Sequence, residues 1–189
     1  MHKKWIVSAA LIIISLSAYA QEYKRFKAAF GIPVSVITSD QFNYYGGFYL
    51  EPAWRWNDQW ASGLYVSLLE SDSQSDYEHL SETGSMLTIA LTTDHYWKLD
   101  RIRPFYGLLV GKSSHLHEQI QRYRYRNGYP VPGDIIWISS SGYTVAPRVG
   151  FDFWHVRTLL MYQLTTHSMP DLLTVQIGLE IGGGRRKRN

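Results

Sequence analysis

The most conspicuous absence in this chain of 189 residues is cysteine, which excludes disulfide bonds, thiol catalysis and cysteine-based metal sites. After residue 20 there is no run of 18 apolar residues, so no transmembrane helix is predicted beyond that point. The chain also carries little net charge. The net charge is +3, and the basic tail Arg185-Arg186-Lys187-Arg188, taken with Lys3 and Lys4, exceeds it. The rest of the chain is therefore near neutral, which argues against nucleic-acid binding.

The first twenty residues have the pattern of a secretory signal. Lys3 and Lys4 precede an apolar stretch from Trp5 to Ala18, and the stretch ends in Ala18-Tyr19-Ala20. This apolar stretch is shorter than the ~20 residues that span a bilayer, which disfavours a retained anchor. We expect residues 1–20 to be a signal peptide, residues 21–184 to form one domain and residues 185–189 to be a basic periplasmic tail.

Aromatic residues and glycine are abundant, with 14 tyrosines, 7 tryptophans and 15 glycines, and they follow a two-residue repeat. In residues 143–153 one face carries Tyr143, Val145, Pro147, Val149, Phe151 and Phe153. The other face carries Thr144, Ala146, Arg148, Gly150 and Asp152. The charges therefore share a face with small residues, and the bulky apolar residues lie opposite. A soluble barrel would show the reverse arrangement.

The same alternation recurs along the chain. It is clear in residues 26–36, 44–56, 60–68, 87–97 and 173–182, and weaker in 103–112 and 157–167, whose phase stays open. Eight segments of about ten residues with one apolar face predict an all-β fold, an eight-stranded antiparallel transmembrane β-barrel with up-and-down topology. The alternative is a soluble, lipocalin-like periplasmic binder, which would need large apolar side chains on its inward face.

The connections between these segments alternate in length. Residues 57–58, 99–102 and 154–156 are tight, whereas 37–43, 69–86 and 113–142 are longer and polar; 167–170 is a short exception. With both barrel ends in the periplasm, the tight turns would lie there and the long loops would face outward. Five of the seven tryptophans would then form an aromatic girdle beside the periplasmic turns: Trp54, Trp56, Trp60, Trp97 and Trp154.

Charged residues occur on the face predicted to point into the barrel. They are Lys27, Glu51, Arg55, Asp94, Arg103, Arg148, Asp152 and Glu180. A barrel of eight strands has room only for side chains, so these ions must be paired to offset their desolvation. We predict a salt-bridge plug, with a polar track for protons or small ions as the alternative. Arg148 is expected to pair with Glu51 or Glu180, and Asp152 with Arg55 or Arg103.

Four stretches carry a family resemblance. They are Y-L-E-P-A-W-R-W-N-D-Q-W-A-S-G-L (Tyr49 to Leu64), R-P-F-Y-G-L (Arg103 to Leu108), A-P-R-V-G-F-D (Ala146 to Asp152) and I-G-L-E-I-G-G-G-R-R-K-R (Ile177 to Arg188). They resemble the small outer-membrane β-barrel domain proteins, which are related in architecture to the OmpX and OmpA barrels. The resemblance covers most of the chain after the signal. It implies the fold and a location in the outer membrane of a Gram-negative bacterium, and it implies little about activity.

Enzymes also occur on this scaffold, notably lipid A deacylase and palmitoyltransferase barrels, so a lipid A-modifying enzyme is an alternative. Thr166-His167-Ser168 and the group Ser113, Ser114 and His115 offer the residue types. However, adjacent His167 and Ser168 would point to opposite faces of a strand. His115 and His117 share a face with no third ligand evident, so a solvated loop is the favoured interpretation. We predict no catalytic residue, no metal site and no cofactor.

The stretch between residues 112 and 142 predicts a hairpin that projects beyond the membrane. Arg122, Arg124 and Arg126 alternate with Tyr123 and Tyr125, residues 127–134 predict a turn, and 135–139, which contains Trp137, returns as a strand. The arginine face could contact lipopolysaccharide phosphates or an acidic partner, because arginine suits bidentate phosphate contacts. Alternatively, the pattern only keeps a projecting ribbon soluble.

Together these features predict a monomeric integral outer-membrane protein with a structural or surface-interaction role and no catalysis. Its expected partners are outer-membrane lipid, lipopolysaccharide and a surface protein.

Overall fold

The computed structural model describes residues 23–37, 44–74, 81–97, 101–120, 124–126, 129–131, 135–166 and 169–183. Its strands, in chain order, are β1 (Phe26–Ile37), β2 (Tyr44–Arg55), β3 (Trp60–Gln74), β4 (Ser81–Tyr96), β5 (Ile102–Ile120), β6 (Arg124–Arg126), β7 (Tyr129–Val131), β8 (Ile135–Phe153), β9 (Val156–Thr165) and β10 (Leu172–Gly182).

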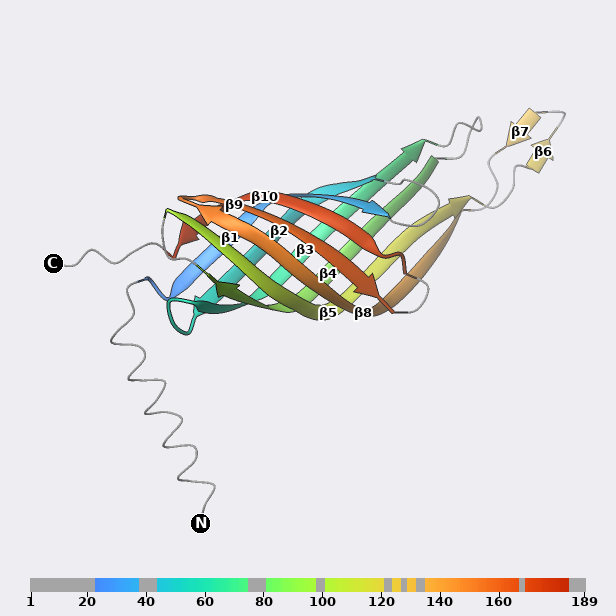
Figure 1. The fold of residues 1–189 in the computed structure, drawn as a ribbon. Helices are drawn as coiled ribbons and strands as arrows, with labels where there is room; N and C mark the ends of the chain where they lie inside the picture. Colours follow the sequence, from blue (N-terminus) through green and yellow to red (C-terminus); the bar gives the residue numbers. More distant parts are fainter. Residues whose placement is uncertain are drawn as a thin grey trace, which may run out of the picture.

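Eight of these strands close into an antiparallel barrel in the order β1-β10-β9-β8-β5-β4-β3-β2, while β6 and β7 pair only with each other (Figure 1). Chain neighbours are sheet neighbours throughout the barrel once the β6–β7 ribbon is set aside, which is up-and-down topology. The prediction of an eight-stranded antiparallel barrel is confirmed. Among the described residues, the structure contains no helix that is long and apolar enough to cross a membrane.

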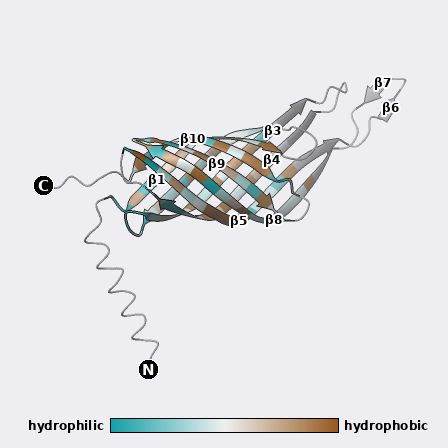
Figure 2. Cartoon of the chain, in the orientation of Figure 1, coloured by the Kyte–Doolittle hydropathy of each residue, from teal (hydrophilic) through white to brown (hydrophobic). Residues whose placement is uncertain are grey.

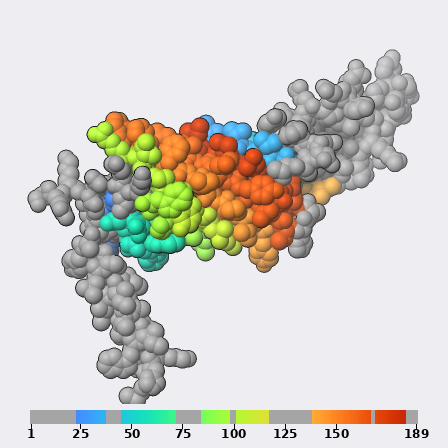
Figure 3. All heavy atoms as spheres, viewed as in Figure 1, coloured from blue at the N-terminus to red at the C-terminus, as the bar shows by residue number. Residues whose placement is uncertain are grey.

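The two-residue repeat separates an apolar outer face from a small or polar inner face. In β10, Ile177 is 59% exposed, whereas its neighbour Gln176 is fully buried. Figure 2 shows apolar residues, in brown, recurring along the strands of the barrel wall, and Figure 3 shows the packed outer surface of this wall with β9 and β10 in orange to red. This arrangement is the inverse of a lipocalin-type barrel, so the soluble alternative is not supported.

Short turns close one end of the barrel, which we call the turn end. The side-chain oxygen of Asn57 accepts hydrogen bonds from the backbone N–H groups of Gln59 (2.9 Å) and Trp60 (2.8 Å), which fixes the turn after β2. The turn after β8 places Trp154 at φ 54° and sets Asp152 opposite Arg157. The following tryptophans are exposed at this end: Trp54, Trp56, Trp60, Trp97 and Trp154.

The opposite end, the outer end, has walls of unequal height. β1, β2, β9 and β10 have 10 to 12 residues, whereas β3, β4, β5 and β8 have 15 to 19. Pairing of β8 with β9 ends at Thr144↔Thr165, while β8 pairs with β5 as far as Ile135↔Ile120. A four-stranded sheet therefore continues past the rim of the barrel (Figure 1), and its longest part is the projecting hairpin that the sequence predicts.

Residues 69–86 are largely strand, so the prediction of a long loop there is wrong. β3 and β4 pair from Leu69↔Met86 to Gln74↔Ser81. Residues 113–120 and 135–142 also extend β5 and β8, as the two sides of the projecting hairpin that the sequence predicts. Above the rim both faces of the sheet lie outside the barrel, so the apolar alternation that marks the lower strands is lost.

Candidate functional site

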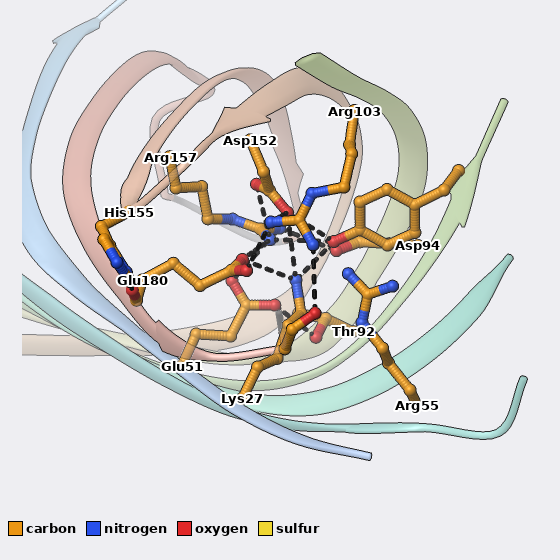
Figure 4. Close-up of polar contacts among 12 residues, drawn as sticks. Lys27, Glu51, Arg55, Thr92, Asp94, Arg103, Asp152, His155, Arg157 and Glu180 are labelled. Atoms are coloured by element: carbon orange, nitrogen blue, oxygen red, sulfur yellow. Dashed lines mark hydrogen bonds and ion pairs between the residues drawn. The ribbon is translucent and has the colours of Figure 1, made fainter. Parts of the chain in front are cut away.

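The interior near the turn end is filled by eight charged side chains from seven strands, all at most 6% exposed. Figure 4 shows that the labelled members point from the barrel wall toward one another in the lumen. We call this set the charge network: Lys27, Glu51, Asp94, Arg103, Arg148, Asp152, Arg157 and Glu180. It contains four cations and four anions, so its formal charges balance.

The first half of the network is built around Arg148 on β8. Its Nη2 lies 2.6 Å from Glu51 Oε1 and 2.7 Å from Asp94 Oδ1. Thr92 also donates a hydrogen bond to Glu51 at 2.8 Å. Gly107 leaves space for this group, because a Cβ added there would lie 2.3 Å from Asp94 Oδ1. A larger residue at that position would displace the carboxylate.

The second half joins two cations to two carboxylates at the turn end. Lys27 Nζ lies 3.1 Å from Glu180 and 3.6 Å from Asp152. Arg103 Nη2 lies 2.9 Å from Glu180 and 3.7 Å from Asp152. The Tyr96 hydroxyl accepts a hydrogen bond from Lys27 and donates one to Asp152 at 2.9 Å. Each carboxylate in this half therefore contacts two cations.

Arg157 on β9 connects the two halves, because it contacts all four carboxylates. Its Nη2 lies 2.7 Å from Asp94 and 3.8 Å from Glu51. Its Nη1 lies 3.4 Å from Asp152 and 3.7 Å from Glu180. The guanidinium also lies over the Phe105 ring, 4.2 Å from its centre, in a cation–π contact. Such multiple pairing is what makes full burial of these ions tolerable.

Sequence reasoning did not include Arg157 in the interior set. Its segment, R-T-L-L-M-Y-Q-L, is apolar on both faces, so the inward face could not be identified. One signal was available, because a two-residue turn at Trp154 and His155 requires residue 157 to pair with Asp152.

For Arg148 and for Asp152, the structure shows a contact with one of the two candidate partners. Arg148 contacts Glu51, and Asp152 contacts Arg103. Glu180, however, lies in the other half of the network from Arg148. The structure places Arg55 beside aromatic rings, with its guanidinium 4.6 Å from the centre of the Tyr96 ring and 5.0 Å from that of Tyr23. Its Nη1 also donates to the backbone carbonyl of Asp58 at 3.3 Å.

Among the side chains that the structure describes, the interior near the outer end contains hydroxyl pairs and an apolar cluster instead of an ion network. Ser35 and Thr174 share a hydrogen bond of 2.8 Å, and Thr88 and Ser113 share one of 2.9 Å. Above them lies the outer cluster: Ile37, Tyr45, Leu69, Met86, Met169 and Leu172. These side chains fill the barrel just below its outer rim.

The residues weighed for catalysis or metal binding lie in strands or outside the described residues. Ser113 is fully buried beside Thr88, and His115 lies on β5 with its Nε2 3.3 Å from the Tyr45 hydroxyl, so this is not a loop. His167, Ser168 and the side chain of His117 lie outside the described residues. In the part of the chain that the structure describes, no group of three His, Cys, Asp or Glu residues could hold a metal ion.

The predicted interaction residues on the hairpin also fall largely outside the described part. Arg122 and Tyr123 are not described, and the side chains of Arg124, Tyr125, Arg126 and Trp137 are not described either. The backbone of residues 124–126 forms β6, paired with β7.

No family model matches the sequence, and no curated protein matches it. Solved structures with the same fold do match. Ail, the attachment invasion locus protein of Yersinia pestis, in complex with the heparin analogue sucrose octasulfate, aligns with TM-score 0.53 at 12% identity, over 84% of this chain and 99% of that chain. Neisserial surface protein A (NspA) aligns with TM-score 0.53 at 11% identity, over 83% and 96%. The outer membrane protein OprG from Pseudomonas aeruginosa aligns with TM-score 0.51 at 10% identity, over 86% and 98%.

These similarities show that the chain has the fold of small outer-membrane β-barrels. They agree with the geometry of the interior, where paired ions and the outer cluster leave the barrel filled by its own side chains.

Proposed function

We propose that the chain is an integral outer-membrane protein of a Gram-negative bacterium, with both barrel ends on the periplasmic side and a non-catalytic role at the cell surface. The support is physical. The outer wall presents large apolar side chains, such as Ile177 and Leu91 at 59% and 70% exposure, that only a lipid environment would cover. OprG, an outer membrane protein of the same fold, adds to this argument.

The filled interior disfavours a transport role. A pore through the turn end would require the charge network to open, and each broken pair would leave a buried ion without its partner. Arg157 by itself contacts four carboxylates, so opening the network would require a large free energy. The inner charges therefore serve the stability of the barrel, and function is expected on the outside.

The observation that carries the proposed surface role is the sheet above the rim. Beyond Tyr143, β8 has no strand on its β9 side among the described residues, and residues 135–142 (I-I-W-I-S-S-S-G) contain neither charge nor proline. The other edge of the sheet, residues 71–74 of β3 (S-D-S-Q), is short and carries Asp72. Natural edge strands are normally protected by charge, proline or brevity, and only the β3 edge has this protection. The β8 edge is thus suited to contact with another molecule.

Lipopolysaccharide and an acidic surface partner remain the proposed ligands of the hairpin, through Arg122, Arg124 and Arg126. Ail, a protein of the same fold, has been crystallised with a sulfated sugar, the heparin analogue sucrose octasulfate. This supports the idea that such a scaffold can present a surface to anionic sugars.

Location and orientation can be tested with single cysteines, because the chain has none of its own. Ile138→Cys lies above the rim, where Ile138 is 46% exposed, and Gln59→Cys lies at the exposed turn end. We expect a membrane-impermeant maleimide to label Ile138→Cys on intact cells, and Gln59→Cys only after permeabilisation. Labelling of Gln59→Cys on intact cells, or recovery of the protein without detergent, would refute the proposal.

The surface role can be tested by deleting residues 118–139, with deletion of residues 75–80 between β3 and β4 as the matched control. We expect the first deletion, and not the second, to abolish recovery of bound lipopolysaccharide or protein partners from intact cells. Both variants should keep heat-modifiable gel mobility, which reports a closed barrel. Unchanged recovery after the first deletion contradicts a binding role for the hairpin.

A further inference from the structure

The outward-facing residues of β5 and β8 change in chemistry from the turn end toward the outer end. Outward-facing residues of β5 and β8 are apolar up to Val110 and Val145, which pair with each other. The next outward pair is Lys112 and Tyr143, and the pair after that is Ser114 and Ser141. This sequence of apolar, cationic and aromatic, then hydroxyl-bearing residues is the order expected where hydrocarbon gives way to lipid headgroups.

Lys112 has a distinctive place in this wall. Among the barrel strands whose side chains are described, it is the one lysine or arginine that faces outward; Lys27, Arg55, Arg103, Arg148 and Arg157 are buried inside. Lys112 is exposed between Ile89 on β4 and Tyr143 on β8, and Tyr143 is 72% exposed. Its ammonium group is therefore presented at the upper boundary of the apolar belt.

A trough rich in hydroxyl groups lies directly above Lys112. Its volume is about 340 Å³, and it contains five serines: Ser85, Ser114, Ser139, Ser140 and Ser141. The register of β4, β5 and β8 explains which residues line the trough. One row of outward residues joins Leu87, Ser114 and Ser141 across three strands, and the next row joins Ser85, Leu116 and Ser139.

We propose that this trough binds the headgroup of a phosphorylated saccharolipid of the lipid A type, with a phosphate at Lys112 and sugar oxygens at the serines. This inference deepens the proposed function and rests on its placement of the outer end toward the outer leaflet. Charge and chemistry define the ligand. The ammonium group selects an anion, and a row of hydroxyl groups suits a sugar, which offers many donors and acceptors.

The position of the trough argues for a lipid as the source of the phosphorylated sugar. Its lower boundary is continuous with the exposed apolar side chains of Leu87, Val110 and Val145, against which acyl chains would lie. A glycerophospholipid would satisfy Lys112, but it lacks the sugar hydroxyls that the serines could bind. A soluble phosphorylated sugar would leave the apolar surface below the trough without a role.

The test uses the full protein extracted in detergent and titrated with diphosphorylated lipid A, its dephosphorylated form and phosphatidylglycerol, with bound lipid counted by native mass spectrometry. We expect diphosphorylated lipid A to bind most tightly. Lys112→Gln should weaken that binding about fivefold, the effect of one lysine on an anionic lipid, and leave the dephosphorylated form unchanged. The double variant Ser114→Ala/Ser141→Ala should weaken the binding of both saccharolipids.

Lys24→Gln is the matched control, because Lys24 is exposed at the turn end, away from the trough. An equal loss with Lys24→Gln, no loss with Lys112→Gln, or equally tight binding of phosphatidylglycerol would each overturn the proposal. All variants are first checked for heat-modifiable mobility. Because this titration in detergent does not depend on orientation, its failure is distinct from failure of the cysteine labelling at residues 59 and 138.

Discussion

The two ends of the barrel interior are filled by different chemistry. The turn end holds eight ions in contact with one another, and the outer end holds hydroxyl pairs below an apolar cluster. A buried ion is tolerable only while its partners are in place, whereas an apolar side chain contributes through contacts that are lost gradually. The two ends should therefore respond differently to single substitutions, the turn end most strongly.

The largest effect is expected from Arg157→Met, because Arg157 contacts all four carboxylates of the charge network. Its loss leaves Arg148 facing both Glu51 and Asp94. The free energy of unfolding should fall by about 3–5 kcal/mol, the typical cost of removing one partner from a buried ion pair. Urea unfolding in detergent, followed by tryptophan fluorescence, measures it.

The control for Arg157→Met is Leu159→Met, which changes the next inward residue of β9, equally buried but without charge. We expect the smaller loss from this variant. If the free energy of unfolding falls equally in the two variants, burial alone, and not the pairing of the ions, determines the stability of the turn end.

The next largest effect is expected at the outer cluster. Leu172→Ala removes a fully buried side chain and should lower the free energy of unfolding by about 2–4 kcal/mol through the cavity it leaves. Its chain neighbour Leu173 faces outward and is 41% exposed, so Leu173→Ala should cost clearly less. Equal losses in the same urea titration would mean that the outer cluster does not stabilise the barrel.

The smallest effect is expected at the hydroxyl pairs. Thr88→Val removes the 2.9 Å hydrogen bond to Ser113 while keeping the volume, and it should cost roughly 1 kcal/mol. A double-mutant cycle with Ser113→Ala isolates the coupling between the two groups. If Thr88→Val costs as much as Arg157→Met, the contrast between the two ends is wrong.

The sequence predicts the fold well because the wall obeys a two-residue repeat wherever lipid lies on one side. It predicts poorly where that condition fails. In β9 the inward residues Leu159 and Met161 fill the lumen beside Arg157 and are as apolar as the outward ones. The sequence therefore does not indicate which face of β9 points inward. Above the rim, residues 71–74 are strand without any lipid-facing alternation.

The candidate site could be predicted only in part. The two-residue repeat identifies which charged side chains point inward. The partner of each charge depends on which strands face one another across the lumen. Glu180 and Arg148 share an inward face and yet lie in different halves of the network. Sequence alone contains no signal for that choice.

Several of the ion pairs join strands that are not neighbours in the sheet. Arg148 on β8 and Arg157 on β9 both reach Glu51 on β2, across the width of the lumen. Such contacts cannot exist in an open sheet, because they form only once β1 has met β10. The network thus couples closure of the cylinder to charge neutralisation, so that none of the seven strands that carry its members can detach without leaving ions on other strands unpaired. Unfolding should accordingly be all-or-none, with fraying confined to the tall sheet above the rim.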